Sequence, residues 1–213
     1  MHTVTLIPGD GIGPEVTNAM EKVVEASGAK INWEKVQAGE AVIEKYNTAI
    51  PDYVIDSIKK NKVAIKGPIT TPVGKGFKSV NVTLRQKLDL YVNLRPIKSF
   101  KGIKSRYEDV DLVIVRENTE DLYAGIEHKI GDYAAESIKI ITKPACERIC
   151  KFAFDYAKDN NRKKVTGVHK ANIMKLSDSL FLNIYREVAK YDDIESVHLI
   201  VDAAAMNLFL TTE

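Results

Sequence analysis

Residues 66–96 read KGPITTPVGKGFKSVNVTLRQKLDLYVNLRP, and the rest of the chain is best interpreted around this stretch. Its first half is interrupted by five glycines and prolines: Gly67, Pro68, Pro72, Gly74 and Gly76. Glycine adopts backbone conformations that other residues avoid, and proline lacks an amide donor, so neither favours a regular element here. The stretch therefore predicts a loop whose backbone turns sharply or approaches another group closely.

The end of that loop carries polar and basic residues. It presents Ser79, Asn81 and Arg85, and a strand-like run at 88–94 then ends at Arg95, which precedes a proline. Because proline cannot continue a central ladder, Arg95 is expected at a strand end, at the mouth of a site. Two guanidiniums with a hydroxyl and a carboxamide suit a small polycarboxylate, since each arginine can bind a carboxylate through two parallel hydrogen bonds. Spacing alone is equally compatible with a surface loop whose charges are solvated.

The composition limits the classes of protein that the chain can represent. Its 213 residues allow one large domain or two small ones, and 45% hydrophobic content is enough for a buried core. A net charge of +2, from 31 basic and 29 acidic residues, does not indicate a nucleic-acid or membrane partner. Cys146 and Cys150 are expected to be reduced thiols in a core. No apolar run approaches the ~20 residues of a membrane span, and the chain opens directly into a strand, so a cytoplasmic protein is expected.

Strands and helices alternate along the chain, which predicts an α/β fold with helices on both faces of a sheet. A polar, glycine-containing segment at 98–107 suggests a domain boundary after residue 101. A hairpin is expected around Gly131-Asp132, between strand-like segments at 123–130 and 137–142. The other expected strands are 4–7, 31–36, 62–66, 110–115, 164–168 and 197–201, and the expected helices are 40–46, 52–60, 180–188 and those that begin at Pro14, Lys143 and Ala203.

The turn at residues 9–14 reads GDGIGP and follows the first strand. Its third glycine stands one position too early for the dinucleotide fingerprint G-x-G-x-x-G, and no acidic residue closes a second strand persuasively. The turn is therefore interpreted as structural, near the edge of a cofactor at most.

Four stretches together resemble one enzyme family. Besides 66–96, they are GDGIGPE at 9–15, RENTEDLYAG at 116–125 and HKANIM at 169–174. In this order they resemble the isocitrate dehydrogenases of the metal-dependent β-decarboxylating dehydrogenase family, which also contains the isopropylmalate dehydrogenases. The resemblance implies a non-Rossmann α/β fold with a first domain at 1–101 and an α+β second domain at 102–213 that carries a dimer clasp. It also implies that the chain holds only the first part of a family member, either as a fragment, as a natural truncation or as a chain that depends on another.

The resemblance assigns substrate-binding roles to five residues. A structural alternative pairs one of them, Arg116, with an acid in the following turn. The five residues are Ser79, Asn81, Arg85, Arg95 and Arg116.

Further roles come from the same resemblance. Tyr123 would protonate the enolate carbon after carbon dioxide leaves, and Lys170 would take the proton of the C2 hydroxyl near the other subunit's tyrosine. Thr71 and Asn172 would contact the cofactor, and Asp202 would be one carboxylate of a Mg²⁺ or Mn²⁺ site. The alternatives are a solvated Lys170 and an Asp202 that caps the next helix.

The function implied by the resemblance is oxidative decarboxylation of isocitrate to 2-oxoglutarate with reduction of NAD, a reaction of the tricarboxylic acid cycle, by a homodimer or homo-oligomer. The chain would hold mainly the substrate half of the site. Two alternatives stand beside it: a non-catalytic or regulatory truncated paralogue that binds a tricarboxylate, and a dehydrogenase of the homoisocitrate or isopropylmalate type.

Overall fold

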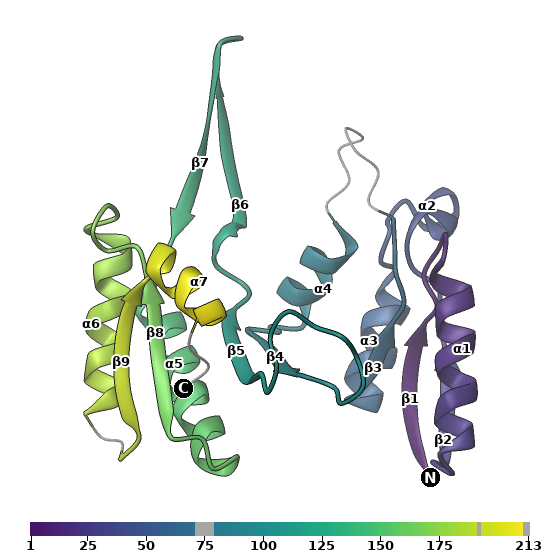
Figure 1. Cartoon of the computed structure of the whole chain (residues 1–213). Coiled ribbons are helices and arrows are strands. Elements are labelled where there is room, and N and C mark those ends of the chain that lie inside the picture. The colour runs from purple at the N-terminus through teal and green to yellow at the C-terminus, as the bar shows by residue number, and fades with distance from the viewer. Residues whose placement is uncertain (71–78, 191–192, 211–213) are drawn as a thin grey trace. The chain divides into compact units, whose positions relative to one another are not determined.

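The computed structural model describes residues 1–70, 79–190 and 193–210, which form two compact units (Figure 1). Unit 1 is Met1–Asp89 and unit 2 is Leu90–Glu213. The division falls earlier than the boundary that the sequence suggests after residue 101, because the strand at 92–98 pairs with the strand at 111–117 and so belongs to unit 2. No helix of the described residues is long and apolar enough to cross a bilayer.

Unit 1 is built on a parallel sheet with the strand order β2-β1-β3. Its core gathers Ile7 at the end of β1 with Val54 of α3 and with Val80 and Leu84 of α4. The parallel pairing confirms the predicted alternation of strands and helices. In chain order the elements are β1 (His2–Ile7), α1 (Gly13–Ala26), β2 (Ile31–Lys35), α2 (Glu40–Tyr46), α3 (Asp52–Asn61), β3 (Ala64–Lys66) and α4 (Val80–Lys87).

The glycine turn between β1 and α1 packs directly against the chain after β3. The amide of Asp10 donates to the Pro68 carbonyl at 3.0 Å, and the Thr70 amide donates to Asp10 Oδ1 at 2.7 Å. A Cβ at Gly9 would lie 1.9 Å from the Pro68 carbonyl oxygen, and Gly9 has a φ of 82°. Only glycine fits there, so these contacts support the structural interpretation of the turn.

Helix α4 replaces part of the loop that the sequence predicts. Residues 80–87 contain no glycine or proline, and Val80 and Leu84, four residues apart, are both buried in the unit 1 core. Ser79 stands at the N-cap, where its backbone carbonyl accepts the Thr83 amide at 3.0 Å. The polar residues of this segment suggested a loop. The segment is helical because two apolar residues on one side of it are buried in the tertiary structure.

The described residues of unit 2 form three two-stranded sheets: antiparallel β4-β5 and β6-β7, and parallel β8-β9. Helices α5 and α6 pack against each other and against β8. The β6-β7 hairpin projects away from these elements and confirms the predicted hairpin (Figure 1). The elements are β4 (Val92–Lys98), β5 (Asp111–Glu117), β6 (Asp121–Ile130), β7 (Ala134–Ile140), α5 (Lys143–Asp159), β8 (Lys164–His169), α6 (Ser177–Ala189), β9 (Glu195–Ile200) and α7 (Val201–Leu210).

Strand β4 continues past the proline at which the sequence predicts its end. Pro96 pairs with Val113, and the strand runs on to Lys98. Proline is tolerated because, among the described residues, β4 has only β5 as a neighbour, so its other edge needs no amide donor. Arg95 therefore lies within a strand and not at its end.

The unit 2 core lies between α5 and α6. Phe154 is 1% exposed and stacks on Tyr185 with ring centroids 5.8 Å apart. Both cysteines are free and buried on α5, and burial raises the pKa of Cys146 to about 11 and that of Cys150 to about 12. These thiols are therefore protonated core residues, as predicted.

Candidate functional site

One face of the β4-β5 ribbon carries two of the predicted arginines. Asn93 lies directly opposite Arg116 in the antiparallel register, so their side chains share a face, and Arg95, two residues after Asn93, shares it too. The Arg95 Nε donates to Asn93 Oδ1 at 3.1 Å. Asn93 is not among the residues predicted from the sequence, although alternation along a strand places residues 93 and 95 on one side. The ribbon thus presents two guanidiniums with an amide between them.

Arg116 also lies against the predicted proton donor. Its guanidinium carbon is 4.6 Å from the centre of the Tyr123 ring, a distance at which the cation is attracted to the ring face. Tyr123 is 37% exposed, so the pair can be reached by a solute. The structure therefore brings together two residues that the sequence places seven positions apart.

The acids after Arg116 are engaged elsewhere. The Glu117 carboxylate accepts the amides of Thr119 and Glu120, both at 2.8 Å. The Glu120 carboxylate in turn accepts the amide and the hydroxyl of Thr142, at 2.9 and 2.6 Å. In the described part of the chain, no carboxylate lies within ion-pair distance of Arg116. The alternative ion pair is therefore not formed there, and the Arg116 charge stays available to a ligand.

The remaining predicted substrate residues lie in unit 1. Asn81 and Arg85 are four residues apart on α4, which places them on one side of the helix next to the N-cap residue Ser79. Burial lowers the pKa of Lys66; Asp10 opposes this effect and Arg85 adds to it. Lys66 is therefore a second cation close to Arg85. Unlike Arg85, Lys66 is not among the residues predicted from the sequence. Thr71 lies outside the described residues.

Lys170 and Asp202 are brought together within unit 2. Lys170 follows the last residue of β8, and its ammonium forms an ion pair with the Asp202 carboxylate. This hydrogen bond holds the pKa of Asp202 below its usual value. Asp202 lies inside the first turn of α7, because that helix begins at Val201; the predicted start at Ala203, with Asp202 as the cap, is wrong. Asn172 is exposed in the turn that follows Lys170.

The residues that the structure describes do not by themselves form a metal site. No three histidine, cysteine, aspartate or glutamate side chains among them are grouped closely enough to bind an ion. The one predicted ligand, Asp202, already pairs with Lys170. A Mg²⁺ ion takes about six oxygen ligands, and a single carboxylate that is shared with an ammonium does not provide them.

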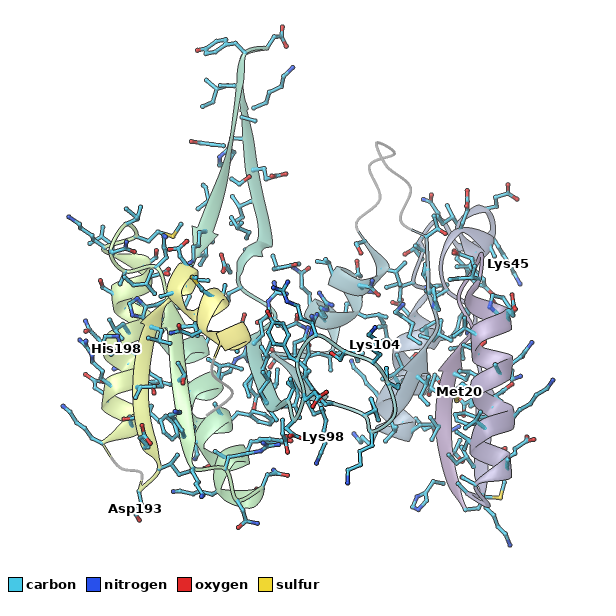
Figure 2. All side chains as sticks on the ribbon, in the orientation of Figure 1. Met20, Lys45, Lys98, Lys104, Asp193 and His198 are labelled. Atoms are coloured by element: carbon cyan, nitrogen blue, oxygen red, sulfur yellow. The ribbon has the colours of Figure 1, made fainter. Side chains whose placement is uncertain are left out.

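Two histidines adjoin the Lys170 turn. The Ala171 amide donates to His169 Nδ1 at 3.1 Å, which leaves the proton of the neutral ring on Nε2, 3.1 Å from His198 Nδ1. His198 lies on β9 (Figure 2), and its Nε2 is 2.9 Å from an Arg186 nitrogen. Burial lowers the pKa of His169; His198 and Arg186 lower it further, whereas Asp178 opposes them. Protonation of His169 is therefore unfavourable in the folded protein.

This lowered pKa predicts a loss of stability in acid. The unfolded chain binds a proton at His169 near its ordinary value of about 6.5, whereas the folded chain does not, so the free energy of unfolding falls as the pH drops below about 6.5. Urea unfolding followed by circular dichroism at about pH 7.5 and about pH 5.5 measures the change. The variant His169→Gln, which cannot titrate, is expected to lose less stability between the two conditions. An equal loss in both proteins would contradict the prediction.

The fold and the site geometry define the class to which the chain belongs. Residues 3–213 match the family model described as isocitrate/isopropylmalate dehydrogenase. The chain is a member of the isocitrate/isopropylmalate dehydrogenase family, which confirms the resemblance seen in the sequence. The fold neighbours agree with this result: the crystal structure of isocitrate dehydrogenase from Methylococcus capsulatus matches with a TM-score of 0.93 and 54% identity, over 100% of this chain and 64% of that one.

Curated relatives are similar along the whole chain. The regulatory subunit 1 of mitochondrial NAD isocitrate dehydrogenase from Arabidopsis thaliana is 53% identical over 100% of the chain and 57% of its own length. The probable alpha subunit of mitochondrial NAD isocitrate dehydrogenase from Drosophila melanogaster is 49% identical over 96% of the chain and 55% of its own length. The chain thus spans about half the length of these relatives.

The expectation of a cytoplasmic protein is contradicted by these comparisons. Both relatives are named as mitochondrial proteins. The expectation rested on the absence of a leader before the first strand. That observation carries no information about location, because the chain corresponds to only about half of each relative.

Proposed function

We propose that this chain provides the substrate-binding part of a site for oxidative decarboxylation of isocitrate, with NAD as the hydride acceptor. One observation carries the proposal. Arg95 and Arg116 share one face of the β4-β5 ribbon, and Arg116 lies against Tyr123 with no carboxylate partner among the described residues. Two guanidiniums beside a phenol suit an anionic substrate that must receive a proton.

The family resemblance implies a role for each predicted residue. Arg95 and Arg116 would bind carboxylates of the substrate, and Arg85 on α4 would bind a third. The Tyr123 hydroxyl would donate a proton to the enolate carbon. Lys170 would accept the proton of the C2 hydroxyl as the neutral amine, after giving up the proton that it carries as the ammonium paired with Asp202. A bound NAD would supply the hydride acceptor for C2, and Asn172 would face it. A Mg²⁺ or Mn²⁺ ion would need ligands in addition to Asp202.

The residues on α4 favour isocitrate over isopropylmalate. Ser79 and Asn81 place a hydroxyl and an amide at the start of the helix, and both groups can hydrogen-bond to a third carboxylate. An isopropyl group would leave those polar groups without partners at that position, which costs binding energy. Isocitrate is therefore expected to bind more tightly than isopropylmalate.

A second function is supported by one comparison. The relative from Arabidopsis thaliana, 53% identical over the whole chain, is named a regulatory subunit. A chain that retains the arginines could bind a tricarboxylate and signal its presence to a catalytic partner without turning it over. The names of the relatives describe subunits, so an oligomer is proposed for either function, with the β6-β7 hairpin as the clasp.

Calorimetric titration tests the proposed substrate site. The chain is titrated with isocitrate in the presence of MgCl₂ and then with NAD, and NADH formation is followed by absorbance. Binding with NADH formation supports the dehydrogenase over the regulatory function. Isocitrate binding without NADH formation supports a substrate half-site, which part of a dehydrogenase and a regulatory chain have in common. Absence of isocitrate binding, or equal binding of isopropylmalate, would contradict the proposal.

Light scattering on the same sample tests the proposed oligomer. A molar mass equal to that of a monomer at high protein concentration would exclude it.

A further inference from the structure

Asp178 is a buried carboxylate that contacts the Lys170 turn. Its side chain is 7% exposed and lies in the first turn of α6. Its Oδ2 accepts the backbone amide of Lys170 at 2.5 Å, and its Oδ1 accepts from the Lys139 ammonium at 2.5 Å. Both oxygens are therefore used, one by the turn after β8 and the other by strand β7.

The charges around Asp178 explain why a carboxylate is tolerated there. The helix N-terminus favours a negative charge in its first turn, and the Lys139 side chain, 21% exposed, supplies a positive one. Lys139 also lies 3.9 Å from Asp121, the first residue of β6, and Tyr123 follows two residues later. A continuous chain of polar contacts thus runs from the base of the hairpin to the backbone of Lys170.

We propose that Asp178 is a positioning residue for Lys170. Its Oδ2 holds the Lys170 backbone, which directs the ammonium toward Asp202, and its Oδ1, through Lys139, ties the Lys170 turn to the base of the β6-β7 hairpin. The effect of Asp178 on catalysis rests on the proposed function, in which Lys170 transfers a proton. A role confined to stabilising the start of α6 is the competing explanation.

Two variants separate these explanations. Asp178→Asn is isosteric and keeps an oxygen that can accept the Lys170 amide, whereas Asp178→Leu has the same branching, a larger volume and no acceptor. Hydrogen exchange of the Lys170 amide reports the contact directly, with the buried Cys150 amide of α5 as an internal reference. Exchange at Lys170 relative to Cys150 is expected to rise roughly tenfold in Asp178→Leu, as for one lost hydrogen bond, and to change by less than about threefold in Asp178→Asn.

Trace acetylation of lysines, read by mass spectrometry, tests the side chains. In Asp178→Leu, labelling of Lys170 is expected to increase several-fold relative to the exposed Lys151, because a displaced ammonium leaves Asp202. In Asp178→Asn, labelling of Lys139 is expected to increase while that of Lys170 stays unchanged, because only the carboxylate charge is lost. This second variant tests the inference even if Asp178→Leu does not fold.

Two outcomes would overturn the inference. One is a lower melting temperature in Asp178→Leu with unchanged exchange and labelling at Lys170, which would leave only the helix-stabilising role. The other is an equal disturbance of Lys170 in both variants, which would exclude the acceptor geometry. None of these measurements uses a substrate, so a failure to bind isocitrate would overturn the proposed function alone.

Discussion

Replacing Phe154 with alanine is expected to lower the free energy of unfolding of unit 2 by about 3–5 kcal/mol. Phe154 is 1% exposed and packs with Ile149, Cys150, Leu182 and Tyr185 in the core between α5 and α6. Removal of the ring loses its burial and leaves a cavity that this packed core cannot close fully. A domain is stable by only about 5–15 kcal/mol, so the variant is expected to be close to unfolding.

The control for this prediction is Phe100→Ala. Phe100 is 74% exposed in the segment between β4 and β5, so the same chemical change there is expected to alter stability by less than about 0.5 kcal/mol. Urea unfolding followed by far-UV circular dichroism measures both variants. The single tryptophan, Trp33, lies on β2 in unit 1, so its fluorescence reports the other unit. Equal losses of stability in the two variants would contradict this description of the core.

Replacing Arg116 with methionine is expected to weaken isocitrate binding by about 2–5 kcal/mol, or roughly 30- to 5,000-fold in Kd. Methionine keeps an apolar stem of similar length but removes the charge and the paired donors that a carboxylate accepts. Because Arg116 contacts Tyr123 and no carboxylate in the described part of the chain, its removal breaks no ion pair there. The loss should therefore appear in binding and not in folding.

Arg106→Met is the matched control, because Arg106 also lies over a tyrosine: its guanidinium carbon is 5.7 Å from the centre of the Tyr107 ring. Arg106 is exposed between β4 and β5, outside the face that carries Arg116. Calorimetry should give unchanged affinity for this variant, and circular dichroism should show that both variants are folded. Equal losses of affinity would indicate a general effect of positive charge and would contradict the assignment of Arg116.

The affinity of Arg116→Lys for isocitrate should lie between those of the wild type and Arg116→Met, because lysine retains the charge but not the paired geometry.

Local pattern determined a large part of this protein. The helical spacing of Ile149 and Phe152 and the proline near the helix start predict α5, which runs from Lys143 to Asp159. The glycine turn between two alternating segments predicts the hairpin. Four motifs in order indicate the family, which the family model confirms. Each of these signals lies within one short segment, so no knowledge of distant contacts is needed.

Burial against distant segments decided the rest. Val80 and Leu84 become helical because the unit 1 core lies against them, which local composition does not reveal. Glu117 could have paired with Arg116, but the amides of the following turn occupy its carboxylate.

The arrangement of the site is likewise a product of tertiary structure. Asn93 faces Arg116 only because of the β4-β5 register, and Asp178 reaches the Lys170 amide from another element. The sequence by itself therefore determined which chemical groups are present and most of the elements that carry them. Only the tertiary structure decided which groups meet, because side-chain partners are chosen by strand register and burial between residues that are distant in the chain.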